Sequence, residues 1–404
     1  MRILMLTQFY LPLIGGEENH VRNLSAALVS RGHEVAIVTL WHKGLAEFEV
    51  EEGVRIYRIK GTLARAEFLF AQTERRSTPP LPDPETVWAL RRIIKEERPA
   101  LVHAHNWLIY SFLPLKKWSG AKLVLSLHDF SFACPIKRFL YQEAICSGPN
   151  LKKCSGCTHA HYGLLKALPT LSGHRLMGLF ERKAVELFLP VSQAIAEGNG
   201  LTHSSLPYQV VPNFIPDEVA KIADQPDPLV AQLPSQKYLL YVGALARYKG
   251  VDVLLRAYAN LKAPSPLVLI GYPAPDMPTE FPPNVKVFQN WPHRAVMQAW
   301  QASLIGLTPS ICAEACPTVV MEAMATGRPV IGTNVGGIPD LIEEGQTGFL
   351  VTPRKADELG AAIERLLSNP ALCERMGLAA QVKIKDFQAT TVVSKIEALY
   401  QKLF

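Results

Sequence analysis

The sequence predicts an α/β protein of two domains, each with a parallel sheet covered by helices. At 404 residues the chain is longer than one hydrophobic core usually supports. Hydrophobic residues make up 48% of it and charged residues 19%, so it can bury a large core. Short apolar runs alternate with amphipathic stretches, once before residue 191 and again after residue 236. We therefore expect Rossmann-like domains over 1–190 and 237–387, joined by a linker region over 191–236.

The elements of the first domain begin at the amino terminus. Its apolar runs are nearly continuous, as in strands that are buried on both faces of a parallel sheet. The expected strands are Arg2–Thr7, Glu34–Thr39, Val54–Ile59, Leu101–His105, Lys122–Leu127 and Phe188–Val191. The expected helices are Glu17–Arg31, Pro84–Glu97 and Trp107–Trp118. Ser192 suits the cap of a further helix. The long stretch Gly61–Pro82 mixes Phe and Arg and predicts a functional loop that could touch an acceptor or a membrane.

The second domain follows a change in composition. Residues 223–236 are rich in Asp, Pro and Gln, as in a linker, and the run VVPNFIPD before them predicts a strand that reaches Asn213. From Lys237, YVGALARYKGVDVLLRA predicts a strand, a glycine turn, a cationic loop and a helix. Further expected strands are Leu267–Gly271, Val285–Phe288 and Ser303–Thr308. Further expected helices are His293–Gln301, Pro317–Ala325, Ala356–Leu367 and Thr391–Leu403.

The distribution of charge narrows the classes of partner. The net charge is +6, and the excess lies in residues 1–200, which hold 25 Lys and Arg against 18 Asp and Glu. An anionic membrane surface or a phosphorylated acceptor would favour this half, although a solvated basic surface explains it equally well. The chain has no basic helix and no basic motif interleaved with aromatic residues, so we expect no nucleic-acid partner.

The sequence also bears on the compartment. No segment approaches the ~20 apolar residues of a membrane span. The first apolar run is interrupted at Thr7 and Gln8 and lacks a small-x-small cleavage site, so a buried strand fits it better than a signal peptide. Seven cysteines, an odd number, are typical of a reducing compartment. We expect a cytoplasmic protein, with a possible peripheral position on the inner face of the membrane.

The stretch from Glu314 to Asp340 places charged residues in a run that otherwise resembles core. Pro317–Ala325 predicts a buried helix with Pro317 at its first position, where the missing N–H costs nothing. Its only polar stripe consists of Thr318, Glu322 and Thr326. An unpaired carboxylate in an apolar setting is costly, so the stripe should face water or a ligand. Glu314 lies eight positions before Glu322, in the loop that precedes the helix.

The two acids therefore flank a helix N-terminus. Its free N–H groups and positive dipole end could hold a diphosphate. The expected cradle consists of Cys316, Pro317, Thr318 and Val319. A carboxylate can accept from a pair of vicinal hydroxyls, so the arrangement fits a sugar nucleotide. Alternatively, Glu314 is a solvated loop acid and Glu322 lies on an exposed helix face.

Glu-x7-Glu followed by AMATGRPVI and a Gly-Gly pair resembles the signature of the retaining, nucleotide-sugar-dependent glycosyltransferases of family four, which have the GT-B fold. The resemblance implies two domains facing across a cleft, with the donor held by the second and the acceptor by the first. It implies that Glu314 contacts donor sugar hydroxyls and that Glu322 binds the ribose. It further implies that a carboxy-terminal helix over 388–404 packs back on the first domain.

The opening of the chain, QFYLPLIGGEENHVRNLSAALVSRGHEVAIVT, is similar to the opening of the same family. The spacing of its glycines is not that of the dinucleotide fingerprint G-x-G-x-x-G. The resemblance implies that Gly15 and Gly16 line the cleft beside the donor diphosphate and acceptor, with Glu17 and Glu18 as weaker neighbours.

Histidines mark the carboxyl ends of two expected strands, where open α/β sheets bind ligands. His128, in His128-Asp129, resembles the histidine of the family that borders the reacting sugar, which implies a substrate-binding or catalytic role. His103 and His105 are second-rank candidates. Asn213 resembles the asparagine of the family's V-I-P-N-G segment, with Phe214 replacing the glycine, and should fix the hinge or border the cleft.

The cationic loop of the second domain predicts diphosphate binding. Arg247 and Lys249 could neutralise a leaving group. The family resembled here has G-R-L-x-x-x-K-G at this place, and Gly243 and Lys249 match it. Ala244 occupies the position of the family's arginine, so we expect Arg247 to reach in instead.

Four cysteines occur within 24 residues of the first domain: Cys134, Cys146, Cys154 and Cys157. Four thiolates this close could bind a structural Zn²⁺ tetrahedrally. An iron–sulfur cluster is a less favoured ligand, and free thiols are the alternative. Resemblance to a cysteine-bearing insertion in members of the family favours zinc as a scaffold. Cys312, Cys316 and Cys373 suit core or loop positions.

The resemblance implies transfer of a hexose-type sugar from a nucleoside diphosphate to an acceptor hydroxyl, with retention of configuration and no cofactor or metal in catalysis. A cell-surface polysaccharide or a lipid-linked acceptor would fit. A sugar-nucleotide epimerase of the same architecture and a non-catalytic sugar-nucleotide-binding protein remain alternatives, the second because of Ala244. A phosphorylase is less favoured, because we see no distinctive motif for a pyridoxal lysine.

Overall fold

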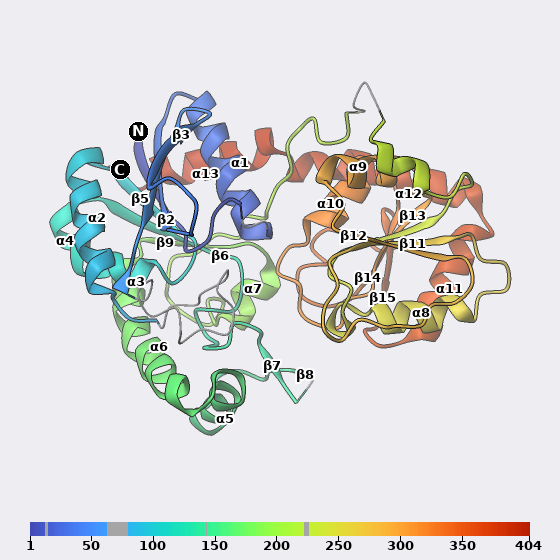
Figure 1. The fold of residues 1–404 in the computed structure, drawn as a ribbon, viewed down its shortest axis with the longest axis horizontal. Coiled ribbons are helices and arrows are strands. Elements are labelled where there is room, and N and C mark those ends of the chain that lie inside the picture. Colours follow the sequence, from blue (N-terminus) through green and yellow to red (C-terminus); the bar gives the residue numbers. More distant parts are fainter. Residues whose placement is uncertain (13–14, 63–79, 143, 222–225) are drawn as a thin grey trace. The chain divides into compact units, whose positions relative to one another are not determined.

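The computed structural model describes residues 1–12, 15–62, 80–142, 144–221 and 226–404 (Figure 1). These residues cluster into two compact units, residues 1–212 with 393–404 and residues 213–392. Each unit contains a sheet of mainly parallel strands, which confirms the predicted fold class. The expected linker region 191–236 is divided between the units at Pro212. Most of the expected functional loop Gly61–Pro82 lies outside the described residues.

The sheet of the first unit has seven strands in the order β3-β4-β2-β1-β5-β6-β9. They are β1 (Arg2–Leu6), β2 (Glu34–Leu40), β3 (Phe48–Glu51), β4 (Val54–Ile59), β5 (Leu101–Ala104), β6 (Lys122–Leu127) and β9 (Leu187–Pro190). Only the β3–β4 pair is antiparallel. Because β5 and β6 are parallel neighbours, the histidines that follow them come out at the same edge of the sheet.

Helices connect the strands of the first unit. They are α1 (Gly16–Ser30), α2 (Pro84–Glu97), α3 (Ile109–Phe112), α4 (Lys116–Ser119), α5 (Leu151–Tyr162), α6 (Leu164–Ala184), α7 (Gln193–Gly198) and α13 (Ala389–Gln401), whose last part belongs to this unit. Val21, Leu24 and Leu28 of α1 are fully buried at helical spacing. Asp83 caps α2 by accepting from the N–H of Thr86. A small hairpin, β7 (Leu140–Tyr141) and β8 (Ala144–Ile145), precedes α5.

The second unit has an all-parallel sheet in the order β12-β11-β10-β13-β14-β15. Its strands are β10 (Leu239–Val242), β11 (Leu267–Gly271), β12 (Val285–Gln289), β13 (Ile305–Thr308), β14 (Val330–Thr333) and β15 (Gly348–Val351). Its helices are α8 (Val251–Ala259), α9 (His293–Ala302), α10 (Thr318–Ala325), α11 (Ala356–Leu367) and α12 (Pro370–Lys383).

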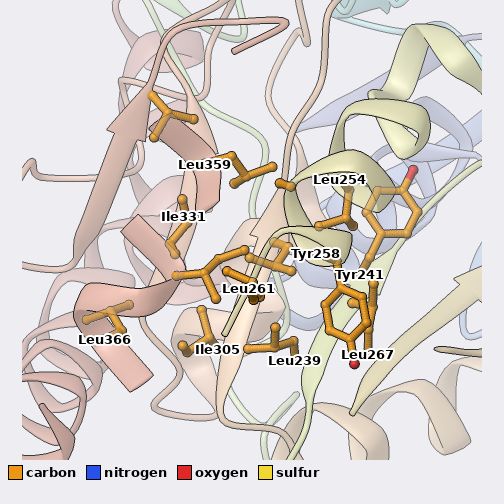
Figure 2. Packing of buried hydrophobic residues seen from close by; sticks show 14 of the residues in the cluster. Leu239, Tyr241, Leu254, Tyr258, Leu261, Leu267, Ile305, Ile331, Leu359 and Leu366 are labelled. Atoms are coloured by element: carbon orange, nitrogen blue, oxygen red, sulfur yellow. The ribbon is translucent and has the colours of Figure 1, made fainter. Parts of the chain in front are cut away.

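The core of the second unit lies between this sheet and the helices α8 and α11. Figure 2 shows Leu239, Ile305 and Ile331 from three strands packed with Leu254 of α8 and Leu359 of α11. All five side chains are 0–1% exposed. Burying a side chain of this size stabilises the fold by roughly 1.5–3 kcal/mol, so this cluster holds the strand ends that carry the candidate site.

The structure corrects several predicted elements. The expected helix Trp107–Trp118 is broken into α3, a 3-10 turn and α4, because Pro114 cannot continue an α-helix. In the described chain the run VVPNFIPD forms one isolated bridge, between Ile215 and Gln388, since Pro212 and Pro216 have no N–H to donate to a ladder. Some elements were not expected from the sequence: the strands β3, β7, β8, β14 and β15 and the helices α5, α6 and α12. Most other elements agree within two residues, and the bounds of α2, β6, β11 and α11 agree completely.

Candidate functional site

Glu314 lies in the loop between β13 and α10. Its carboxylate accepts from Lys249 Nζ at 2.6 and 2.9 Å and from Ser310 Oγ at 2.6 Å. The Glu314 side chain is 13% exposed and that of Lys249 is 23% exposed. Glu314 is therefore a paired and mostly buried carboxylate, which rules out the alternative of a solvated loop acid.

Lys249 ends the 3-10 turn Arg247–Lys249, and the next residue, Gly250, sets its position. Gly250 has φ +77°, and a Cβ there would lie 1.8 Å from the carbonyl oxygen of Pro309. Only glycine allows this approach of the turn to the end of β13. Burial by itself would lower the pKa of Lys249, but the adjacent carboxylate outweighs it, so the pKa of Lys249 lies above its ordinary value. The ammonium stays charged.

The glycine pair that follows β14 supports the Glu314 backbone. The N–H of Gly337 donates to the Glu314 carbonyl at 2.7 Å. Gly336 has φ +61°, and a Cβ on it would lie 2.2 Å from the same oxygen. The sequence predicted turns at these glycines but could not assign them to Glu314, which is more than 20 positions away.

Glu322 lies on α10 and is 7% exposed, and Thr326 is 8% exposed. Neither side chain faces open solvent, which excludes the alternative that Glu322 lies on an exposed helix face. Thr326 Oγ1 donates back to the Ala323 carbonyl at 2.8 Å, and Glu322 Oε1 lies 3.1 Å from His293 Nε2. The hydrogen bond with Glu322 raises the pKa of His293. The sequence analysis missed His293, which starts the neighbouring helix α9.

Pro317 is the N-cap of α10. The sequence analysis expected it one position later, as the first helical residue. The amides of Thr318 and Val319 have no acceptor within the helix, as at any helix N-terminus. The carbonyl of Cys316 accepts from Asn213 Nδ2 at 3.1 Å, which places Asn213 beside the start of α10. Asn213 Oδ1 is buried and has no hydrogen-bond partner among the described residues.

Ala244 is buried, and its carbonyl accepts from the Tyr241 hydroxyl at 2.7 Å. Gly243 donates its N–H to Ile270 at the adjacent strand end. Arg247 is exposed. Its backbone N–H donates to the Asp276 carboxylate at 3.2 Å and its carbonyl accepts from the N–H of Gly250 at 2.8 Å. The structure brings Lys249 and Glu314 together but leaves the Arg247 side chain in solvent.

The first unit gathers histidines at the ends of β5 and β6. His105 Nδ1 lies 3.0 Å from His128 Nε2. His103 is held between the Tyr400 hydroxyl at 2.6 Å and Ser126 Oγ at 2.8 Å. Burial lowers the pKa of His103 to about 3 and lowers the pKa of His105 far below its ordinary range. Both imidazoles are therefore neutral. His103 is fully buried and serves packing, whereas His105 directly contacts His128.

His20 of α1 joins this cluster and was missed by the sequence analysis. Its ring centroid lies 4.9 Å from that of His128, and burial lowers its pKa well below the ordinary value. Ligand nitrogens of His20, His105 and His128 lie within 4.8 Å of one another. Imidazole nitrogens at this spacing could hold a transition-metal ion. Elsewhere in the described chain no other group of three His, Cys, Asp or Glu is this close.

The four cysteines of the expected zinc site do not form such a group. Cys154 and Cys157 lie on α5, which the sequence did not predict as a helix. Cys146 Sγ lies 3.9 Å from Lys153 Nζ, and Cys134 lies before the hairpin. Burial raises the pKa of the Cys134 and Cys157 thiols. The described geometry is that of free thiols.

Gly15 is the N-cap of α1 and Gly16 its first residue. Glu17, which the sequence ranked as a weaker neighbour, accepts from Thr7 Oγ1 at 3.0 Å and from Asn106 Nδ2. Although part of its surface is exposed, the surrounding protein displaces water and raises the pKa of Glu17 to about 8, with Glu18 and Asp129 adding to the rise. Asn106 was missed, because only the fold brings it to α1.

Two family models match the chain, one in each half. They are described as "Glycosyltransferase Family 4", over residues 14–218, and "Glycosyl transferases group 1", over residues 231–383. Glycogen synthase of Mycobacterium tuberculosis (strain H37Rv) is 25% identical over 431 aligned residues, which cover 99% of this chain and 94% of that protein. D-inositol 3-phosphate glycosyltransferase of Corynebacterium aurimucosum is 31% identical over 180 residues, which cover 41% of this chain and 42% of that protein.

Solved structures of other proteins also match this chain over its whole length. Sucrose-phosphate synthase from Thermosynechococcus elongatus has a TM-score of 0.74 at 19% identity and covers 100% of this chain and 98% of its own. Anabaena HepE, in complex with UDP and glucose, has a TM-score of 0.70 at 17% identity and covers 100% of both chains. With mainly parallel sheets in both units and both family models matched in order, the chain belongs to glycosyltransferase family 4 and has the GT-B fold.

Proposed function

We propose that this glycosyltransferase moves a hexose-type sugar from a nucleoside-diphosphate sugar to an acceptor hydroxyl with retention of anomeric configuration. The observation that carries the proposal is the Lys249–Glu314 pair beside the N-terminus of α10, with Glu322 on that same helix. A charged ammonium, free helix amides and two held carboxylates are the groups that a sugar nucleotide requires.

The donor roles follow from the hydrogen bonds that remain available. Lys249 directs two contacts to Glu314, and an ammonium has three donors, so one is left for a phosphate oxygen. The Glu314 carboxylate offers about four acceptor sites and uses three, which leaves room for a sugar hydroxyl. In this proposal Lys249 and the amides of Cys316 to Val319 stabilise the leaving diphosphate, and Glu322 binds the ribose.

Three further residues complete the donor side of the proposal. Gly243 and Asn213 line the donor site, and the buried Asn213 Oδ1 is an acceptor that a ligand donor would satisfy. Arg247 would have to turn from solvent toward the diphosphate, taking the place of the arginine that Ala244 replaces. On the acceptor side, Gly15, Gly16 and His128 would border the diphosphate, the acceptor and the reacting sugar. No metal need take part in transfer.

The relatives support a nucleotide donor and leave the base open. HepE is described with UDP, with UDP and glucose and with UDP-glucose, and starch synthase IV of Arabidopsis thaliana with ADP and acarbose. The acceptor in this proposal is a cell-surface polysaccharide precursor or a lipid-linked intermediate, with the enzyme on the cytoplasmic side of the membrane.

The four cysteines could still bind a structural zinc ion after moving closer, which elemental analysis of the purified protein would detect.

The experiment begins with calorimetric titration of UDP, GDP, ADP and their sugar conjugates. We expect one nucleotide to bind selectively, Glu322→Ala to lose that binding, and Glu374→Ala, which removes an exposed glutamate from α12, to keep it. Transfer to an acceptor panel, with the anomeric configuration of the product followed by NMR, then tests the reaction. Product from the donor alone would indicate the epimerase, and binding without any turnover would indicate a sugar-nucleotide-binding protein.

A further inference from the structure

The helix α6 presents an apolar face to solvent. Its 21 residues include Leu165, which is 93% exposed, and Leu164 and Leu168, which are 74% and 73% exposed. The exposed apolar set, here called the α6 face, consists of Leu164, Leu165, Leu168, Leu176, Leu179 and Phe180. At 3.6 residues per turn these positions fall within an arc of about 160°. A stripe of this length on one side of a helix is more than the scattered exposed leucines of ordinary surfaces.

The opposite side of α6 is anchored in the first unit. Ala167, Met177 and Glu181 are buried, and the Glu181 carboxylate accepts from the Tyr110 hydroxyl at 3.1 Å. In Figure 1, α5 and α6 form the rim of this unit, in green. The leucines therefore point outward because the other side of the helix is fixed.

The charge around the α6 face is one-sided. Residues 151–184 contain six Lys and Arg and a single acid, Glu181, which is buried. On α6, Lys166, Arg175, Arg182 and Lys183 are all exposed. The surface is therefore apolar and cationic, with no exposed carboxylate on the helix.

A groove opens beside the carboxy-terminal half of α6. It has a volume of about 750 Å³ and is lined by Leu113, Pro114, Met177 and Phe180, among others. Lys116, Lys117 and Lys183 also line it, together with Glu186, which pairs with Lys116 at 2.7 Å and leaves Lys117 and Lys183 as the cations in excess. An apolar groove with cations at its edge suits an acyl chain whose headgroup is anionic.

We propose that the α6 face is a docking surface for a bilayer that contains anionic lipid, with the adjacent groove receiving one lipid molecule. The helix would lie in the interface with its apolar face down and its cations beside the headgroups. Crossing the bilayer is not an option for α6, because none of the described helices combines the length and apolar composition that a span requires. A second copy of the face is a poorer partner, since pairing two such faces would bring like charges together.

The test measures co-sedimentation of the full chain with vesicles of phosphatidylcholine alone and of phosphatidylcholine with phosphatidylglycerol. We expect binding to the anionic vesicles only, weakened by salt. Leu165→Glu with Leu168→Glu should abolish it. The matched control is Leu378→Glu with Val382→Glu, at positions of α12 that are 59% and 67% exposed, and it should bind as the original protein does. Lys166→Gln and Arg175→Gln should each weaken binding about fivefold.

Three outcomes would overturn the proposal. They are equal binding to neutral vesicles, no binding to either kind, and unchanged binding by the Leu165/Leu168 variant. A dimer in light scattering that this variant dissociates, with no vesicle binding, would identify the face as a contact between copies. Thermal melts of the variants check folding. Calorimetric nucleotide titration is a separate readout, so a failure of docking does not count against the donor site, and a failure of nucleotide binding does not count against docking.

Discussion

At the scale of single residues, the pairing of Lys249 with Glu314 decides how the candidate site works. Each side chain is largely buried and each holds the other. Removing the Lys249 side chain would leave the Glu314 carboxylate buried without its cation, which lowers stability. Removing the Glu314 side chain would leave the Lys249 ammonium charged but no longer held in place. The pair should therefore behave as a unit in stability, whereas the two side chains have different roles toward the donor.

Glu314→Ala should lower the transfer rate about 10²–10³-fold, because the donor sugar and Lys249 both lose a contact, while nucleotide affinity changes far less. Lys249→Ala should weaken nucleotide affinity directly, because the diphosphate loses its cation. Initial-rate kinetics and calorimetry on both variants and on the double variant check this. Equal losses of rate and nucleotide affinity in Glu314→Ala would argue against a donor-sugar role.

The pH response of His293 reports on Glu322. The hydrogen bond raises the pKa of His293 in the folded protein above 6.5. The protonated pair thus stabilises the fold below pH ~6.5 and this contribution disappears as pH rises through the folded-state pKa. Urea unfolding of the original protein and of His293→Gln should differ more at pH ~6 than at pH ~8. In Glu322→Gln, the NMR titration midpoint of His293 should move down, and an unmoved midpoint would contradict the pairing.

At the scale of elements, glycines decide how closely the loops of the second unit approach. Gly250→Ala should destabilise the protein by more than about 2 kcal/mol, because it combines an unfavourable φ with a clash against Pro309. It should also displace Lys249 and weaken nucleotide binding. Gly360→Ala in α11 is the control. Its new Cβ would make only ordinary van der Waals contacts, with Ala257 and Leu261, and the variant should be more stable by about 0.5–1 kcal/mol. Denaturant midpoints of the two variants measure the difference.

The elements also show how local the predictive signals are. The bounds of α2 could be predicted because Asp83, Pro84 and the apolar spacing are all local signals. The α6 helix was missed because its leucines lie on the exposed side while its buried side includes His174 and Glu181, which is not the usual amphipathic pattern, and because it contains Pro169. The same exposed leucines that obscured the helix suggest its docking role.

At the scale of the whole molecule, the carboxy-terminal segment belongs to the first unit. Glu397 pairs with Arg31 at 3.1 Å and with His33 at 2.8 Å, and the Tyr400 hydroxyl contacts His103. A chain that ends at Val392 should lose stability in the first unit, because α13 no longer covers His103, while the second unit keeps its core. Differential scanning calorimetry should show a lowered transition for the first unit and a transition that nucleotide still shifts upward. Loss of nucleotide binding in this truncated chain would contradict that independence.

The sequence by itself determined the two mainly parallel α/β units and the family, and it named the acids and the lysine that we propose for the donor site. Those depend on local hydrophobic periodicity and on motifs that are contiguous along the chain. Only the tertiary structure decided which groups meet: Lys249 with Glu314 across 65 positions, Glu322 with His293, and His20 with His105 and His128. Local pattern contains no information about such contacts, because parallel strands and tight glycine loops bring distant segments together only after each core has packed.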